Sequence, residues 1–142
     1  MSDPLYKPAL LRLAADATGA GRLNVPCATA TAFNPACGDK ITIDVAMDNG
    51  RIATIAHDTK ACVLTQAAAA ILGAEVAGLS HDEVSLLHKA VSAMLSADAH
   101  PPPAPFDVFS VFDGVAEHRN RHRCVLLPIE ALLAALDTLE SR

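Results

Sequence analysis

Four residues of this chain have side chains suited to binding a metal ion or a metal-sulfur cluster: Cys37, Asp39, Cys62 and Cys124. Thiolates and carboxylates are ligands of zinc and of iron, and three sulfurs with one oxygen can complete a tetrahedral set. Each of the four lies at the end of a predicted helix or strand. The sequence therefore predicts a metal or cluster site that is assembled from separate parts of the fold.

The spacing of these cysteines argues against a closed zinc knuckle. Closed structural zinc sites usually take cysteine pairs two to four residues apart, because one turn then presents both sulfurs to the ion. The chain has no such pair, since its candidate ligands come from three separate stretches. We therefore expect a site that is open at one edge and can load and release its cargo.

Composition restricts the class of protein. The chain has 142 residues, 51% of them hydrophobic, and a formal net charge of −5, which predicts one globular domain and argues against nucleic acid as a partner. The start of the chain has no secretory signal pattern, and its longest apolar run, residues 67–72, is too short to cross a membrane. We expect a cytoplasmic protein without membrane contact, whose cysteines are ligands or reactive thiols rather than disulfides.

Hydrophobic patterns predict the elements that position the site. Residues 5–17 have helical spacing and end before two glycines, and a first strand is predicted between residues 25 and 33. Residues 40–47 alternate between apolar and polar, the turn Asp48-Asn49-Gly50 follows, and residues 51–57 form the returning strand. Three antiparallel strands result.

The second half of the sequence is predicted to be helical. Residues 62–73 form a small-residue helix that Gly73 ends, and Ser80 with Glu83 forms a capping box for a helix that ends near Ser96. A proline-rich loop at 100–105 and an apolar segment at 106–112 come before an amphipathic last helix. Pro128 is predicted to start or kink this helix, which would place Cys124 at a helix junction. The predicted fold class is α+β, a three-stranded antiparallel sheet packed on one side by several helices, including an N-terminal helix and the C-terminal amphipathic helix.

Together these features resemble the IscU/NifU-type iron-sulfur cluster assembly scaffolds, through the stretch Asn34-Pro35-Ala36-Cys37-Gly38-Asp39 and the later positions of Cys62 and Cys124. The resemblance covers nearly the whole chain and implies one IscU/NifU-like domain over residues 1–142. It implies a transient [2Fe-2S] cluster or iron bound by Cys37, Asp39, Cys62 and Cys124. It also implies a cysteine desulfurase and recipient iron-sulfur apoproteins as partners.

Several details place the chain nearer one branch of that family. The 62-residue gap from Cys62 to Cys124, with Arg121 three residues before Cys124, is similar to the SufU-type branch, and residues 101–105 fall in its inserted region. Thr59-Lys60-Ala61 replaces a glycine-rich approach to Cys62, and the serine-rich run after it is reduced to Thr65, Gln66 and alanines. Arg123 stands where IscU-type members have a histidine ligand, which leaves His122 as a substitute candidate and Asp39 as the better fourth ligand.

Three functions remain open on this reading. The first is a non-catalytic scaffold that accepts sulfur from a desulfurase, with Cys124 and Cys37 as candidate persulfide acceptors and Arg121 and Arg123 favouring the Cys124 thiolate by charge. The second is a zinc-binding sulfurtransferase accessory of a SufS-type desulfurase. The third is an interaction module that has lost its metal.

Each of these residues also has a plain structural interpretation. Cys27 belongs to no motif and is predicted to pack as a small hydrophobic residue. Asp39 could cap a turn or the entry to a strand. The histidines other than His122 lack ligand spacing and are predicted to lie at the surface or to be satisfied locally.

Overall fold

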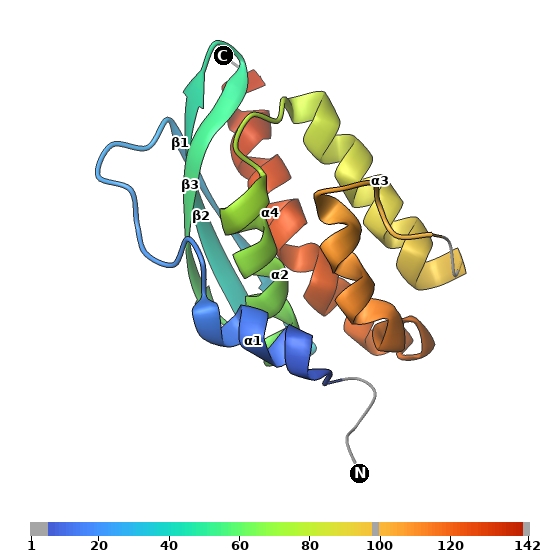
Figure 1. The fold of residues 1–142 in the computed structure, drawn as a ribbon. Helices are drawn as coiled ribbons and strands as arrows, with labels where there is room; N and C mark the ends of the chain where they lie inside the picture. The colour runs from blue at the N-terminus through green and yellow to red at the C-terminus, as the bar shows by residue number, and fades with distance from the viewer. Residues whose placement is uncertain (1–5, 98–99, 141–142) are drawn as a thin grey trace.

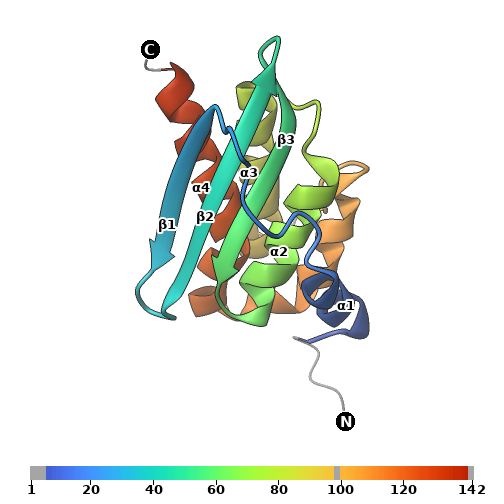
Figure 2. The same cartoon turned by 90° about the vertical axis from the view of Figure 1, so that its left-hand side faces the viewer.

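The computed structural model describes residues 6–97 and 100–140 and has the predicted α+β architecture (Figure 1). Three strands, β1 (Ala28–Asn34), β2 (Asp39–Asp48) and β3 (Arg51–Lys60), form one antiparallel sheet in the order β1-β2-β3. The helices cover a single face of this sheet, and the other face is turned away from them (Figure 2). The predicted start of the first helix at Leu5 lies outside the described residues.

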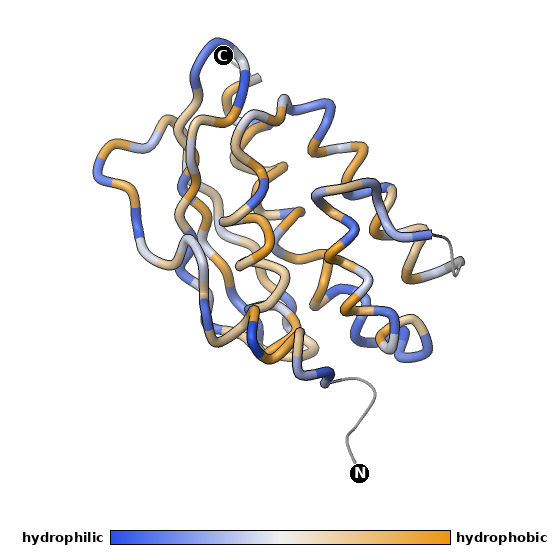
Figure 3. Tube along the Cα trace, in the orientation of Figure 1, coloured by the Kyte–Doolittle hydropathy of each residue, from blue (hydrophilic) through white to orange (hydrophobic). Residues whose placement is uncertain are grey.

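The alternation of β2 sets the two faces of the sheet. Ile41, Ile43 and Val45 are fully buried against the helices and lie opposite Ala32, Ala30 and Ala28 of β1 in the antiparallel register. The short side chains of β1 leave room for the long last helix to pack closely on the sheet. Figure 3 shows the apolar residues concentrated between the sheet and the helices.

Four helices and two 3₁₀ segments make up the rest of the fold. They are α1 (Pro8–Asp16), α2 (Val63–Glu75), α3 (His81–Ala97), the 3₁₀ segments η1 (Phe106–Glu117) and η2 (Arg119–Arg121), and α4 (His122–Glu140). Helix α4 packs on β1 and β2, α2 packs on β3 and α4, and α1 and α3 pack on α2 and α4 respectively. The capping box at Ser80 is present, since Glu83 N–H bonds Ser80 Oγ and Ser80 N–H bonds Glu83 Oε1.

Three element boundaries differ from the sequence prediction. Strand β3 continues from His57 to Lys60, because these polar residues still pair with β2. Helix α2 continues through Gly73 to Glu75, and Gly73 instead allows a close approach, since a Cβ there would lie 2.1 Å from the Thr18 carbonyl oxygen. The last helix begins at His122, so Pro128 lies inside it and Cys124 lies in its first turn rather than at a junction.

The outer face of the sheet is partly covered by residues 18–27. This segment pairs with the edge of β3 at His57 and then crosses the sheet to enter β1 (Figure 2). At the crossing, Arg22 donates two hydrogen bonds to Asp44 of β2, at 2.7 and 3.0 Å. Asp44 is thereby fully buried on the face that the helices leave open.

Candidate functional site

Three of the four predicted ligands meet at one end of the sheet, and the fourth lies beside them. Cys37 lies in the turn between β1 and β2, Asp39 is the first residue of β2, and Cys62 is the N-cap of α2. Cys124 comes from the first turn of α4, which runs across β1 and β2. Four separate elements therefore end or begin where the candidate ligands lie (Figures 1 and 2).

The turn before β2 is held by Asn34. Its carbonyl accepts the N–H groups of Cys37 and Gly38 at 3.1 and 2.9 Å, and Gly38 takes the positive φ of 72° that the turn needs. The side chain of Asn34 is 3% exposed, and its Nδ2 lies 3.8 Å from Cys124 Sγ. Asn34 therefore fixes the exposed Cys37 and the buried Cys124 relative to each other.

The ligand atoms are close enough to share one ion. One ligand atom each of Cys37, Asp39 and Cys124 lie within 4.8 Å of one another, and the two Sγ atoms are 3.7 Å apart. Two sulfurs bound at about 2.3 Å to a tetrahedral ion would stand about 3.8 Å apart. Cys62 Sγ lies outside this group of three but next to it, 3.4 Å from Asp39 Oδ2. Three sulfurs and one oxygen, with which no Lys or Arg forms an ion pair in the described part of the chain, are a donor set that fits iron or zinc.

Asp39 also has a structural role. Its Oδ1 accepts the backbone N–H of Cys62 at 2.9 Å, so its carboxylate lies at the N-terminus of α2, where a negative charge is favourable. This is capping, as the structural interpretation of Asp39 predicted, but it acts on α2 rather than on its own turn. Asp39 is 2% exposed and makes no ion pair within the described part of the chain.

Thr65 is a site residue that the sequence reasoning missed. It is fully buried, and its Oγ1 lies 3.0 Å from Asp39 Oδ2, 2.9 Å from the Cys124 carbonyl oxygen and 3.5 Å from Cys62 Sγ. Its position three residues after Cys62 places both on one face of α2, and that spacing could have indicated it. Thr65 therefore connects three of the four candidate ligands.

Pro128 explains why the Cys124 carbonyl needs Thr65. In an α-helix this carbonyl would accept the N–H of the residue four positions later, which is Pro128, and proline has no N–H. The Thr65 hydroxyl donates in its place at 2.9 Å. A hydroxyl has one proton, so Thr65 can donate to Cys124 or to Asp39 but not to both at once.

Electrostatics distinguish the three thiols. The hydrogen bond from Cys124 lowers the pKa of Cys62 to about 6, with Thr65 acting in the same direction and burial opposing both. The bond with Cys62, together with burial, raises the pKa of Cys124 well above its usual range. The two thiols therefore influence each other in opposite directions, which lowers the pKa of Cys62 and raises that of Cys124.

Arg123, the basic residue next to Cys124, makes its contacts with other groups. Arg123 donates to the Phe33 carbonyl oxygen at 3.3 Å and lies 3.8 Å from Glu130, and Arg121 belongs to the short 3₁₀ segment before α4. The expectation that these arginines favour the Cys124 thiolate stays a prediction, while the bond with Cys62 and burial act in the opposite direction on the pKa of Cys124. His122 donates from Nε2 to the Ala116 carbonyl oxygen at 3.0 Å and is not one of the clustered ligand residues in the described structure.

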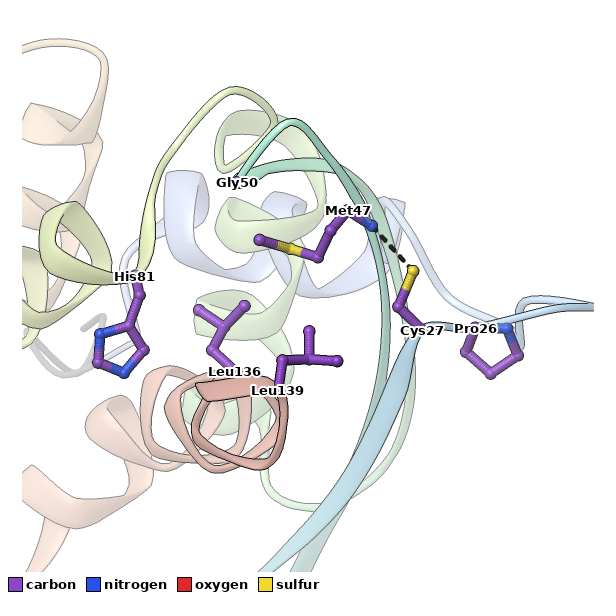
Figure 4. A pocket seen from close by; sticks show the side chains of 7 residues that line it. All are labelled: Pro26, Cys27, Met47, Gly50, His81, Leu136 and Leu139. Carbon is purple, nitrogen blue, oxygen red and sulfur yellow. Dashed lines mark hydrogen bonds between the residues drawn. The ribbon is translucent and has the colours of Figure 1, made fainter. Parts of the chain in front are cut away.

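Cys27 lies at the other end of the sheet. It precedes β1, whose seven residues span about 20 Å to the turn that bears Cys37. Its sulfur accepts the backbone N–H of Met47 at 3.3 Å, beside a cavity of about 810 Å³ that is also lined by His81, Leu136 and Leu139 (Figure 4). Cys27 is exposed, so the prediction that it packs in the core is wrong, and it is remote from the other thiols.

The fold and these residues define a class of protein: a small α+β domain that presents three cysteines and an aspartate at one end of an antiparallel sheet. The sequence matches the NifU-like N-terminal domain family over residues 5–136. The chain belongs to this family.

Individual relatives agree with this assignment. The chain is 29% identical over 103 residues to the iron-sulfur cluster assembly scaffold protein IscU of Streptococcus pyogenes serotype M1, a match that covers 72% of this chain and 65% of that protein. The crystal structure of a nitrogen-fixing NifU-like protein (N-terminal) from Brucella abortus superposes with a TM-score of 0.93 at 28% identity, covering 99% of this chain and 97% of that one. The resemblance predicted from the sequence is confirmed.

A third relative supports the fold. The putative SUF-system scaffold protein of Fervidobacterium islandicum AW-1 superposes with a TM-score of 0.85 at 20% identity, over 96% of this chain and 99% of that one. Within the described residues, none of the helices combines the length and hydrophobicity needed to cross a membrane.

Proposed function

We propose that this chain is a scaffold on which a transient [2Fe-2S] cluster is built from iron and donated sulfur and then passed to recipient apoproteins. The observation that carries the proposal is the group of Cys37, Asp39 and Cys124, whose ligand atoms lie within 4.8 Å of one another with Cys62 beside them. Family membership and the match to an IscU scaffold support it. The four free thiols fit the reducing conditions of the cytoplasm.

Sulfur would enter at Cys37. A cysteine desulfurase donates sulfur as a persulfide, R–S–SH. An attacking thiolate takes the outer sulfur, so the S–S bond breaks, the donor leaves as R–S⁻, and the scaffold carries Cys–S–SH. Conversion of this outer sulfur to the sulfide of a cluster takes two electrons, which an external thiol or electron-transfer protein would supply. Cys37 is exposed in its turn whereas Cys124 is fully buried, so Cys37 is the better acceptor of the two predicted candidates.

Asp39 and Thr65 would make the site able to release its cargo. A carboxylate binds iron-sulfur clusters less strongly than a thiolate does. If Asp39 binds metal, Thr65 can turn its single proton to the Cys124 carbonyl, which has no helical donor. When Asp39 binds metal, the Thr65 hydroxyl therefore still has an acceptor, the Cys124 carbonyl.

A zinc-binding sulfurtransferase accessory is the second candidate. The observation that favours it is the 3.7 Å separation of the Cys37 and Cys124 sulfurs, which suits a single tetrahedral zinc ion. In that case zinc would hold the thiolates until a donor cysteine displaced one of them.

Metal and acid-labile sulfide analysis of the anaerobically purified protein separates these functions. Iron with sulfide supports the scaffold, whereas stoichiometric zinc without sulfide supports the accessory. Cys37→Ser, Cys62→Ser and Cys124→Ser should each abolish stable binding, and Cys27→Ser is the matched control that should leave it unchanged. Wild-type protein that binds neither metal would refute both proposals.

A further inference from the structure

An exposed aromatic and cationic row crosses the outer face of the sheet at the site end. Phe33 of β1 lies opposite Lys40 of β2, which in turn lies opposite Lys60 of β3. All three are exposed, and Phe33 is 55% exposed although it is a large apolar residue. Figure 2 shows this face turned away from the helices.

Neither lysine of this row forms an ion pair with any residue that the structure describes. Like charges directly opposite each other on neighbouring strands are unfavourable. Within the described ranges neither lysine has a carboxylate within 4.0 Å, and Lys40 Nζ lies instead 5.7 Å from the centre of the Phe33 ring. The chain as a whole carries a net charge of −5, so this pair of neighbouring lysines is a local exception to its overall sign.

Arg123 extends the row at the edge of β1. Its guanidinium donates to the Phe33 carbonyl oxygen at 3.3 Å, and its side chain is 57% exposed. We call Phe33, Lys40, Lys60 and Arg123 the cationic row.

Each member of the cationic row is a close chain neighbour of a site residue. Strand alternation turns Asp39 inward and Lys40 outward, and likewise Asn34 inward and Phe33 outward. Arg123 directly precedes Cys124, and Lys60 lies two residues before Cys62. A partner on the row would therefore lie beside the turn that carries the exposed Cys37.

We propose that the cationic row is the docking surface for an acidic, partly apolar face of the cysteine desulfurase that donates sulfur to this site. The inference rests on the proposed function. The two lysines, which have no ion-pair partner among the described residues, attract an acidic surface, and their position beside the Cys37 turn orients it there. Phe33 supplies an aromatic anchor, a residue type enriched at protein interfaces.

The test is binding of the purified desulfurase from the same source to the full chain, measured by calorimetry at low and at high salt. Lys60→Glu should weaken binding about tenfold or more at low salt, and less at high salt because ions screen the attraction. Its matched control is Lys89→Glu on α3, an exposed site with the same change of charge, which should bind as the wild type does. Phe33→Ser should weaken binding at both salt concentrations, whereas Leu86→Ser, at a position 63% exposed on α3, should not.

Metal content of the same variants separates this inference from the proposed function. Lys60→Glu and Phe33→Ser should keep the wild-type metal and sulfide stoichiometry, because their side chains point away from the thiols. Three results would overturn the proposed docking surface: equal weakening by Lys89→Glu, unchanged binding by Lys60→Glu, or no binding by the wild type. None of them would change the conclusion from the metal content. If Lys60→Glu and Phe33→Ser bind the desulfurase normally but transfer less cluster to an apoprotein, the desulfurase is not the partner of the cationic row. The row would then be the docking surface for the recipient apoprotein. A wild-type chain without metal would refute the proposed function, and the binding data would still decide the docking surface.

Discussion

Strand β2 carries two buried aspartates on opposite faces of the sheet, and their surroundings differ. Asp44 on the outer face accepts two hydrogen bonds from Arg22, one from the Leu23 N–H at 3.0 Å and one from Thr29 Oγ1 at 2.6 Å. Asp39 at the site accepts one firm bond from Cys62 N–H and shares the Thr65 proton with a carbonyl. The first carboxylate is neutralised and fully bonded, while the second keeps acceptor capacity without a cation.

This difference distinguishes a structural carboxylate from one available to metal. Buried charges are stable when they are paired and fully hydrogen-bonded. Asp44 meets that condition with groups of the protein alone, and the pairing with Arg22 lowers its pKa to about 2. Asp39 lies among three thiols with only part of its capacity used. We therefore expect changes at Asp44 to alter stability, and changes at Asp39 to alter cargo release.

The largest effect on stability is expected for Asp44→Ala. It removes the side-chain bonds of Arg22 and Thr29 to β2 and leaves the Leu23 N–H without its acceptor, while the backbone pairing at His57 remains. Because Arg22 is 55% exposed and can turn to water, we expect a loss of about 2 to 3 kcal/mol in the free energy of unfolding rather than the larger cost of a stranded buried charge.

Urea denaturation measures this change. Asp58→Asn, an exposed carboxylate on the same face, is the control and should change stability by less than about 0.5 kcal/mol. Metal content should be the same in both variants. If Asp44→Ala lost metal while remaining folded, the separation of the two aspartates into different roles would be wrong.

Acid should remove the Asp44 contribution in a defined range. Its pKa is about 2 in the folded chain against a usual value of 3.8, so the stabilisation is complete above pH 4 to 5 and is lost as pH falls toward 2. The shift corresponds to about 2 kcal/mol.

The comparison that isolates this effect is the wild type against Asp44→Asn, whose side chain cannot ionise. Denaturation at several pH values between 5 and 2 should show the difference in stability between them shrinking by about 2 kcal/mol as pH falls. A difference that stays constant across this range would mean that the Arg22 pair does not set the pKa of Asp44.

The sequence could predict the helices, the strands and the candidate ligands. It could not predict that residues 18–27 bury Asp44, or that Thr65 contacts the site. Strand alternation at residues 40–47 and the Asn49-Gly50 turn are local signals, and they gave the correct strands and fold class. Asp44 was predicted to face away from the core, and it is buried there only because a distant loop crosses that face. The contact between Arg22 and Asp44 depends on the path of the chain between the first helix and β1. The alternation of apolar and polar residues along a strand carries no information about that path.

The use of Gly73 was misread and that of Pro128 was missed for a related reason. Both residues commonly end or interrupt helices, and the sequence alone offers no other use for them. In the fold, Gly73 admits the Thr18 backbone against α2, and Pro128 leaves the Cys124 carbonyl free for Thr65. The cysteines and Asp39 could be selected by residue type, whereas the neighbours that position them required the packing of α2 against α4.

Thr65→Val tests the connection between α2 and the site. Valine keeps the shape but removes the hydroxyl, so the buried Cys124 carbonyl loses its donor and stability should fall by about 1 to 2 kcal/mol. Thr65→Ser keeps the hydroxyl and should retain most of that stability. In a Pro128→Ala background the new backbone N–H can donate to the same carbonyl, so the cost of Thr65→Val should shrink by about 1 kcal/mol. An unchanged cost in that background would show that the carbonyl is not the group Thr65 serves.

Asp39→Ala should have the smallest effect on stability and a distinct effect on cargo. The loss of its bond to the Cys62 N–H should cost about 1 kcal/mol, which is typical of a helix cap, in contrast to the larger loss at Asp44. With the weakest ligand removed and the thiols intact, a reconstituted cluster should decay several-fold more slowly, followed anaerobically by its visible absorption in the presence of a chelator. Asp44→Asn is the control and should decay at the wild-type rate. Faster loss of the cluster from Asp39→Ala would show that Asp39 holds the cluster firmly. The proposed difference between Asp44 as a structural carboxylate and Asp39 as a labile ligand would then be wrong.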